Sequence, residues 1–214
     1  MIPLLLIVTA LIAYFMGGIN GAIIISKYVF HKDVRNYGSG NAGLTNFYRT
    51  FGAAWAAAVV AVDVLKSVIA LLIGGALMST VGNAFVGKAF AGFCLILGHT
   101  WPAMYQFRGG KGALCAGAMV MFLDWRVGLL CWAVFVAIVI FTRYVSLASM
   151  TACMCAPLLI WLFGHGGLEG LLVLFCALLV VFNHRSNILR LIQHRESRLN
   201  IGRDPGKRMS DDKF

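Results

Sequence analysis

The segment of residues 37–50 combines three glycines with polar side chains at a spacing that suits an anion. Gly38, Gly40 and Gly43 allow the backbone to turn tightly and to expose its N–H groups. Around them lie neutral donors and one fixed cation, namely Ser39, Asn41, Thr45, Asn46 and Arg49. Backbone N–H groups at a glycine turn that leads into a helix, with an arginine nearby, suit a phosphate. The alternative is a flexible loop whose serine and asparagine only cap the next helix.

A second glycine-rich segment, residues 98–112, begins Gly-His-Thr-Trp-Pro and ends Phe-Arg-Gly-Gly-Lys-Gly. A loop of this kind can place backbone donors and an ammonium group around an anion, and its candidate residues are His99, Arg108, Gly109, Gly110, Lys111 and Gly112. The loop is not a Walker A motif, because that motif has serine or threonine after its lysine. The alternatives are a tight charged loop and, for His99, a residue that only hydrogen-bonds the end of its own helix.

A third polar segment, residues 183–196, follows the last apolar run and contains His184 and Asn187, three residues apart on one helix face. It could equally be a basic amphipathic segment that rests on anionic lipid headgroups. A further turn adds the cation Arg143 and the hydroxyls of Ser146 and Ser149. Because these segments hold several cations and almost no carboxylates, together they predict an anion site.

Other chemistry-bearing residues lie within apolar runs. Asp63 and Lys66 are three residues apart and can pair on one helix face, as a functional pair or as a structural clamp. The six cysteines fall in apolar runs and indicate no disulfide framework, and no His/Cys cluster has the spacing of a metal site. We therefore expect neither a metal nor a cofactor.

Membrane helices must position all of these residues, because the composition excludes a soluble globular domain. Of 214 residues, 60% are hydrophobic and only 12% are charged, and the mean hydropathy is +0.85. Long apolar runs are typical of membrane spans. We predict an all-α, polytopic integral membrane protein of about seven spans, at residues 4–25, 51–77, 85–104, 113–123, 127–142, 147–163 and 168–182.

The distribution of charge predicts the orientation of these spans. Nearly all of the 18 Lys and Arg residues fall in connections on one side, which the positive-inside rule assigns to the cytoplasm. The N-terminus is then outside and the C-terminus inside, and the net charge of +10 reflects topology and not nucleic-acid binding. The first apolar run lacks a basic region before it and is kept as a span. Residues 1–202 form one membrane domain, and residues 203–214 are expected to be a disordered cytoplasmic tail.

The polar segments resemble those of the bacterial membrane glycerol-3-phosphate acyltransferases that use acyl phosphate, the PlsY type. The first motif, Gly-Ser-Gly-Asn-x-Gly-x-Thr-Asn-x-x-Arg, is present from Gly38 to Arg49. The second is similar from Gly98 to Gly112, where Trp101 replaces the usual phenylalanine and Arg108 the usual lysine. The third, His-Arg-x-Asn-Ile-x-Arg-Leu, runs from His184 to Leu191. The resemblance covers nearly the whole chain, in order.

The resemblance implies transfer of a fatty acyl group from acyl phosphate to the sn-1 hydroxyl of glycerol 3-phosphate, giving lysophosphatidic acid and phosphate in the bacterial inner membrane. It implies that Arg49, Lys111, His184 and Asn187 hold glycerol 3-phosphate, while Ser39 and the glycine loops hold the phosphoryl group of the donor. Either His184 or the departing phosphate could accept the hydroxyl proton. The rival function is a transporter or channel for an anionic phosphorylated solute. None of the five histidines begins the His-x-x-x-x-Asp pattern of the acyl-CoA-dependent or acyl-carrier-dependent enzymes, because none has an aspartate five residues later.

Overall fold

The apolar runs form helices because a helix satisfies every backbone N–H and C=O group within one segment, as the hydrocarbon core of a bilayer requires. The computed structural model describes residues 1–199, which contain helices and loops but no strand, and this confirms the all-α class. The predicted tail at 203–214 lies outside the described residues. The helices are α1 (Ile2–Gly18), α2 (Gly21–Tyr28), α3 (Leu44–Phe51), α4 (Ala56–Ser79), α5 (Ala84–Thr100), α6 (Ala113–Leu123), α7 (Trp125–Thr142), α8 (Val145–Leu162), α9 (Leu168–Asn183) and α10 (Arg185–Ile192), with 3-10 turns at Val34–Asn36 and Ala103–Tyr105.

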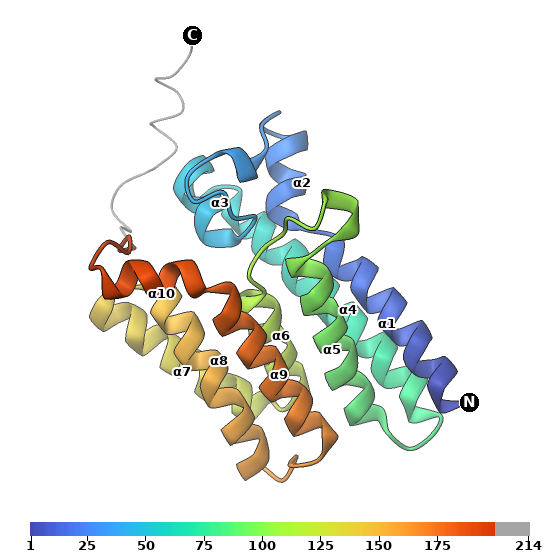
Figure 1. The fold of residues 1–214 in the computed structure, drawn as a ribbon. Coiled ribbons are helices and arrows are strands. Elements are labelled where there is room, and N and C mark those ends of the chain that lie inside the picture. Colours follow the sequence, from blue (N-terminus) through green and yellow to red (C-terminus); the bar gives the residue numbers. More distant parts are fainter. Residues whose placement is uncertain (200–214) are drawn as a thin grey trace.

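The helices are arranged as two groups that meet at α6 and where α5 packs on α9 (Figure 1). Helices α1, α4 and α5 pack together on one side, and α7, α8 and α9 pack together on the other. Helix α6 contacts α4, α5, α7, α8 and α9, so it lies at the centre of the bundle. With eleven residues, α6 is shorter than each of the five helices that it contacts.

Within residues 1–199, length and composition identify fewer candidate spans than the seven predicted, and some of these candidates are bent. Four helical segments are long and apolar enough to cross a membrane, and up to six are when each of two bent pairs counts as one span. The pairs are α1 with α2, bent by 41°, and α9 with α10, bent by 56°. Helix α6, predicted as the fourth span, is only about 16 Å long, roughly half the hydrocarbon thickness of a bilayer. The predicted second span also starts later, at Ala56, because Gly52 with φ of 89° ends the separate helix α3.

The break between α1 and α2 has a local cause in the sequence. Asn20 caps α2, since its side-chain oxygen accepts a hydrogen bond from the Ile23 N–H at 3.0 Å. Its amide group donates to the Ala42 carbonyl at 3.0 Å. The same side chain therefore starts a helix and anchors the loop of residues 37–43.

Helices α1 and α5 approach each other closely at two glycines. A Cβ atom at Gly98 would overlap the backbone carbonyl of Tyr14, and one at Gly17 would overlap the backbone of Leu95. Small residues at such crossings let membrane helices pack backbone to backbone. This contact fixes the end of α5, and hence the position of His99, against the end of α1.

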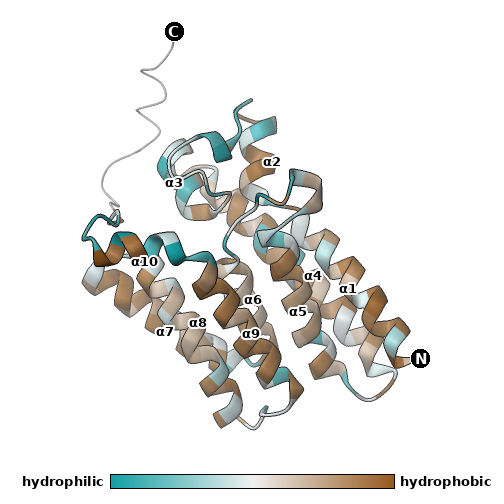
Figure 2. Cartoon of the chain, viewed as in Figure 1, coloured by the Kyte–Doolittle hydropathy of each residue, from teal (hydrophilic) through white to brown (hydrophobic). Residues whose placement is uncertain are grey.

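The hydrophilic residues gather at the end of the bundle that carries α2, α3 and α10 (Figure 2). The flanks of the bundle are hydrophobic, and exposed side chains such as Phe15, Leu72, Phe141, Trp161 and Leu178 cover them. Exposed apolar surface of this extent fits a lipid environment. The three polar segments of the sequence thus meet at one end, as predicted.

A small core separate from the main one holds the polar end together. Helices α2 and α3 pack on α4 through buried residues that include Ile23, Phe47, Phe51 and Val59. The rings of Phe47 and Phe51 lie 5.0 Å apart. This core positions α3, and with it the loop that precedes α3 and the side chain of Arg49.

Candidate active site

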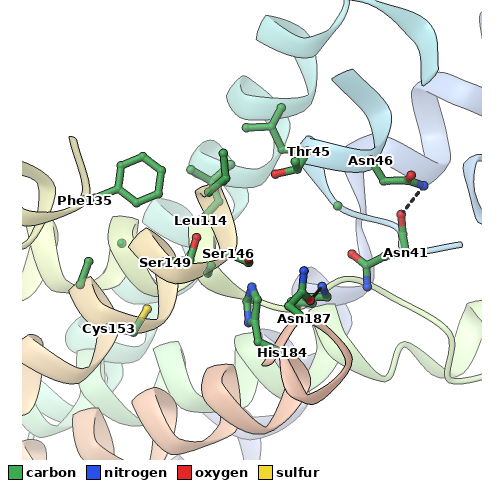
Figure 3. Close-up of a pocket in the computed structure, with 18 of the residues that line it drawn as sticks. Asn41, Thr45, Asn46, Leu114, Phe135, Ser146, Ser149, Cys153, His184 and Asn187 are labelled. Carbon is green, nitrogen blue, oxygen red and sulfur yellow. Dashed lines mark hydrogen bonds between the residues drawn. The ribbon is translucent and has the colours of Figure 1, made fainter. Parts of the chain in front are cut away.

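A cavity of about 400 Å³ opens at the polar end of the bundle (Figure 3). All three polar motifs contribute to its wall, together with apolar side chains of α6, α7 and α8. The predicted site residues that line it are Ser39, Asn41, Thr45, Asn46, Arg49, His99, Lys111, Gly112, Ser146, Ser149, His184 and Asn187. The apolar part of the wall includes Leu114, Gly117, Trp132, Phe135, Ala152 and Cys153. One part of the cavity is therefore lined by polar side chains, and we call it the polar chamber. The remainder is lined by apolar side chains.

Asn46 builds the first loop and has little capacity left for a ligand. Its side-chain oxygen accepts a hydrogen bond from the Ser39 N–H at 2.9 Å, and its amide group donates to the carbonyls of Tyr37 and Asn41, both at 3.0 Å. Gly38 and Gly40 have positive φ angles, 57° and 69°, which glycine adopts without strain. These two glycines shape the loop without lining the cavity.

The second loop is folded back on the end of α5. The Gly110 N–H donates to the His99 carbonyl at 3.0 Å, and the Gly109 N–H donates to the Thr100 carbonyl at 3.1 Å. The Gly109 carbonyl in turn accepts from the Ala42 N–H of the first loop at 3.3 Å. The N–H groups of Gly109 and Gly110 thus hold the second loop to α5, and the Gly109 carbonyl joins it to the first loop, which differs from the backbone cradle that the sequence suggested.

Two helices begin at the cavity wall. The first residues of α3, Leu44 and Thr45, line the cavity, and so do the first residues of α6, Ala113 and Leu114. The first N–H groups of a helix have no partner within the helix and carry a partial positive charge. The two helix starts therefore bring a partial positive charge to the cavity wall.

The third motif brings a carboxylate that sequence reasoning missed. Glu196 accepts hydrogen bonds from Ser146 at 2.7 Å, from Asn187 at 2.6 Å and from Arg190 at 2.7 Å. The Asn187 side-chain oxygen also accepts a hydrogen bond from the ammonium group of Lys111. Glu196 is the single acid in residues 183–199, which is the only signal for it in the sequence.

The cavity keeps a positive balance although two carboxylates line it. Asp63 pairs with Lys66 at 2.7 Å, which confirms the predicted ion pair, and Glu196 pairs with Arg190 at 2.7 Å. Within residues 1–199, neither Arg49 nor Lys111 forms a salt bridge. The Arg49 side chain donates instead to the Ser197 carbonyl at 2.9 Å.

Burial changes the proton affinity of these groups. It lowers the pKa of Lys111 to about 8, because the ammonium form loses solvation, and the charge of Arg190 lowers it further. Burial also lowers the pKa of Arg49. For Glu196, burial alone would raise the pKa, but the hydrogen bonds from Ser146, Asn187 and Arg190 together lower it. At neutral pH the cavity therefore presents two cations that have no acidic partner among residues 1–199.

His184 is held with one ring nitrogen free to accept a proton. Its Nδ1 lies 2.7 Å from the Val180 carbonyl oxygen. Because a carbonyl oxygen only accepts hydrogen bonds, Nδ1 carries the hydrogen and Nε2 carries a lone pair. Figure 3 shows His184 beside Asn187 at the cavity.

Two predicted cations lie away from the cavity wall. Arg108 and Arg143 are exposed, and neither lines the cavity. Arg143 adopts a φ of 61° at the end of α7, and its carbonyl accepts a hydrogen bond from the Leu199 N–H at 2.7 Å. Gly109 and Gly110 also do not line the cavity and act through the loop contacts above.

The fold and the cavity define an all-helical membrane protein with a cationic site, bounded by an apolar wall, at one end of its bundle. The sequence profile of the family "Glycerol-3-phosphate acyltransferase" matches residues 7–194. The chain therefore belongs to the glycerol-3-phosphate acyltransferase family, in the PlsY branch that the motifs indicate.

Individual relatives agree with this assignment. The chain is 45% identical to the glycerol-3-phosphate acyltransferase of Thermoanaerobacter sp. strain X514, over 90% of this chain and 95% of that protein. It is 37% identical to that of Clostridioides difficile strain 630, again over 90% and 95%. A crystal structure of PlsY, an integral membrane glycerol 3-phosphate acyltransferase, in its glycerol 3-phosphate form superposes with a TM-score of 0.83 at 32% identity, covering 91% of this chain and 96% of that one. Its lysophosphatidic acid form gives a TM-score of 0.80 at 30% identity, covering 91% and 95%.

Proposed function

We propose that this protein transfers a fatty acyl group from acyl phosphate to the sn-1 hydroxyl of glycerol 3-phosphate. The observation that carries the proposal is that one cavity combines an apolar wall with two cations, Arg49 and Lys111, that have no acidic partner in the part of the chain that the structure describes. Two phosphorylated substrates, one with an alkyl chain, match such a site in charge and in polarity. The solved PlsY relatives, in glycerol 3-phosphate and lysophosphatidic acid forms, support the same acceptor and product.

Glycerol 3-phosphate occupies the polar chamber in this proposal. The Lys111 ammonium and the Arg49 guanidinium bind its phosphate through charge-assisted hydrogen bonds. Asn187, which Glu196 holds at 2.6 Å, orients Lys111. The Arg49 guanidinium donates to a neutral acceptor, the Ser197 carbonyl, and a phosphate replaces that acceptor because two opposite charges make a stronger hydrogen bond.

The acyl donor occupies the remainder of the cavity. Its phosphoryl group lies at the first loop, near Ser39 and the start of α3, where backbone donors and the helix dipole favour a negative charge. Its chain runs along the apolar wall past Leu114 and Phe135, which Figure 3 places on the side away from Asn46.

The transfer itself needs positioning and charge neutralisation. The sn-1 oxygen forms a bond to the acyl carbon, and the bond from that carbon to the phosphate oxygen breaks, so that phosphate leaves with the electron pair. His184 Nε2 accepts the hydroxyl proton, which ends on the departing phosphate. An acyl phosphate is a mixed anhydride and is already activated, so the chain need supply no nucleophile of its own.

The donor is tested by giving the purified protein glycerol 3-phosphate with either palmitoyl phosphate or palmitoyl-CoA. We expect lysophosphatidic acid, detected by mass spectrometry, from palmitoyl phosphate only. Product from palmitoyl-CoA alone would overturn the donor assignment. The rival function, transport of an anionic solute, calls for polar groups along a path through the membrane, whereas here they gather at one end (Figure 2).

The lowered pKa of Lys111 predicts the pH dependence of the reaction. Below a pKa of about 8 the free enzyme carries the ammonium form, and above it the neutral amine no longer attracts phosphate. We therefore expect kcat/KM for glycerol 3-phosphate to be level from about pH 7, where the substrate phosphate is a dianion, to about pH 8, and to fall tenfold per pH unit above it. Lys111→Arg, where active, should move this fall to higher pH, because arginine stays protonated. A value of kcat/KM that holds to pH 10 in the unchanged protein would contradict the assignment.

We propose that the polar end faces the cytoplasm of a bacterium, within its inner membrane. The end that carries α2, α3 and α10 also carries most of the Lys and Arg residues, and the positive-inside rule places such an end inside. A cysteine-reactive, membrane-impermeant reagent should label an added cysteine at Tyr28 only after the cells are opened. Labelling of intact cells at this position would reverse the orientation.

A further inference from the structure

Three charged or titratable side chains lie buried together at the cavity wall, and two of them, Asp63 and His99, line it. Asp63 and Lys66 on α4 and His99 at the end of α5 are each less than 5% exposed. The Lys66 ammonium nitrogen lies 2.7 Å from Asp63 Oδ1 and 2.9 Å from His99 Nδ1. Burying charges is costly unless they are paired and hydrogen-bonded, so the contacts of this cluster define what it does.

The ion pair bridges the break between α1 and α2. Lys66 donates to the carbonyls of Gly17 at 3.1 Å and Ile19 at 2.7 Å, where α1 ends. Asp63 accepts from the N–H of Gly21 at 3.3 Å, where α2 begins. A cation at a helix end and an anion at a helix start both satisfy free backbone groups and match the helix dipoles. These contacts hold Lys66 in place.

The contact with Lys66 determines which nitrogen of the His99 imidazole ring carries the hydrogen. An ammonium group has only donors, so His99 Nδ1 accepts a hydrogen bond from Lys66 and carries no hydrogen. The hydrogen of the neutral ring is then on Nε2. This is the opposite arrangement to that of His184, whose Nδ1 carries the hydrogen.

The Nε2 atom of His99 lies where the two glycine-containing loops meet. A Cβ atom at Gly110 would overlap His99 Nε2 and would lie 2.9 Å from the Ala42 carbonyl oxygen. His99 lines the cavity, and its Nε2 has no hydrogen-bond partner within residues 1–199. A buried side chain thus directs an unpaired N–H to the cavity wall, and Gly110 leaves room beside it.

We propose that Lys66, supported by Asp63, holds His99 as the Nε2–H tautomer so that this N–H donates to a phosphoryl oxygen of the acyl donor. The inference rests on the proposed function, in which the first loop holds the phosphoryl group of the donor. The first loop meets the second loop at His99, so this residue lies beside that group. The His99 hydrogen bond strengthens as the phosphate departs with its electron pair. His99 touches the substrate, while Lys66 and Asp63 are positioning residues.

The tautomer is measured on the unchanged protein. Long-range ¹H–¹⁵N spectra of ¹⁵N-histidine-labelled protein in lipid nanodiscs distinguish the two tautomers and the imidazolium ion, and the His99→Gln variant assigns the signal. We expect Nε2–H, with the Nε2 signal shifting as inorganic phosphate is added. A signal from Nδ1–H or from the imidazolium, or one that phosphate leaves unmoved, would overturn the proposal. This measurement requires no turnover, so its result does not depend on whether the proposed acyl transfer occurs.

Two amide variants test the roles of the two ring nitrogen atoms separately. In His99→Gln the amide can reach the position of Nε2 and donate to the ligand, whereas in His99→Asn it can reach only the position of Nδ1 and accept from Lys66. We expect kcat/KM for palmitoyl phosphate to fall less than tenfold in the first and about 100-fold in the second, near the loss of one oxyanion donor. KM for glycerol 3-phosphate should be unchanged in both. Greater activity in His99→Asn than in His99→Gln would assign His99 to the Lys66 contact alone and contradict the proposal.

The positioning role of the ion pair has its own readout. Single substitutions would leave a buried charge without a partner, so Asp63→Asn and Lys66→Met are combined to remove both charges. In this double variant we expect His99 to populate both tautomers. A pure Nε2–H signal in the folded double variant would remove Lys66 and Asp63 from the proposal. Should the variant not fold, the tautomer and the phosphate shift of the unchanged protein still decide it.

Discussion

Lys111→Ala is expected to abolish glycerol-3-phosphate-dependent turnover while leaving the bundle folded. The ammonium group is one of the two cations that line the cavity without a salt bridge among residues 1–199, so its loss removes half of the charge that attracts phosphate. Hydrogen bonds to charged groups are worth about 1.5–3 kcal/mol each, and a phosphate engages more than one donor. We therefore expect kcat/KM to fall by about 1,000-fold or more, measured as formation of lysophosphatidic acid.

The matched control is Lys32→Ala, which removes a cation from the same end of the molecule at a position that does not line the cavity. We expect it to retain activity within about twofold. Thermal unfolding in detergent, followed by size-exclusion chromatography, should give the same midpoint for both variants and the unchanged protein. Near-normal turnover in Lys111→Ala would remove the residue from the phosphate site.

His184→Ala is expected to lower kcat by about 100-fold or more, the usual contribution of a positioned acid–base group. The hydrogen bond of Nδ1 to the Val180 carbonyl directs a lone pair on Nε2 to the cavity, and alanine removes that acceptor. KM for palmitoyl phosphate should change little, since the proposed contacts of the donor lie at the first loop. Steady-state kinetics with each substrate varied in turn separate these effects.

The matched control for His184 is His194→Ala, an exposed histidine just after α10 that does not line the cavity. Its kcat should equal that of the unchanged protein. If His184→Ala kept kcat and lost only affinity for glycerol 3-phosphate, the departing phosphate would be the proton acceptor and His184 a binding residue. The role of His184 in proton transfer would then be wrong.

The sequence predicted the helices well because lipid leaves few other structures available to an apolar run. The predicted fourth span at 113–123 coincides with α6, and the Asp63–Lys66 pair forms as its spacing indicated. Breaks within apolar runs were harder to predict. The run at 4–25 is mostly apolar, yet it divides at one polar residue, Asn20, whose side chain caps α2 and also bonds to Ala42 of a distant loop.

Most of the predicted site residues line one cavity, but their hydrogen bonds could not be predicted from the sequence. Glycine and arginine in polar loops indicated an anion site, and twelve of the predicted residues do line one cavity. However, the N–H groups of Gly109 and Gly110 bond to the end of α5, because the loop folds back in a way that only tertiary contacts define. Glu196 reaches Ser146 on α8 for the same reason, across 50 residues of chain.

The most direct test of the account is phosphate release by the purified protein given palmitoyl phosphate, with and without glycerol 3-phosphate. The buffer contains no acyl-CoA and a chelator of divalent metal ions. We predict release only when glycerol 3-phosphate is present, with one lysophosphatidic acid formed for each phosphate. Release without glycerol 3-phosphate, or no release with both substrates present, would contradict the proposed reaction.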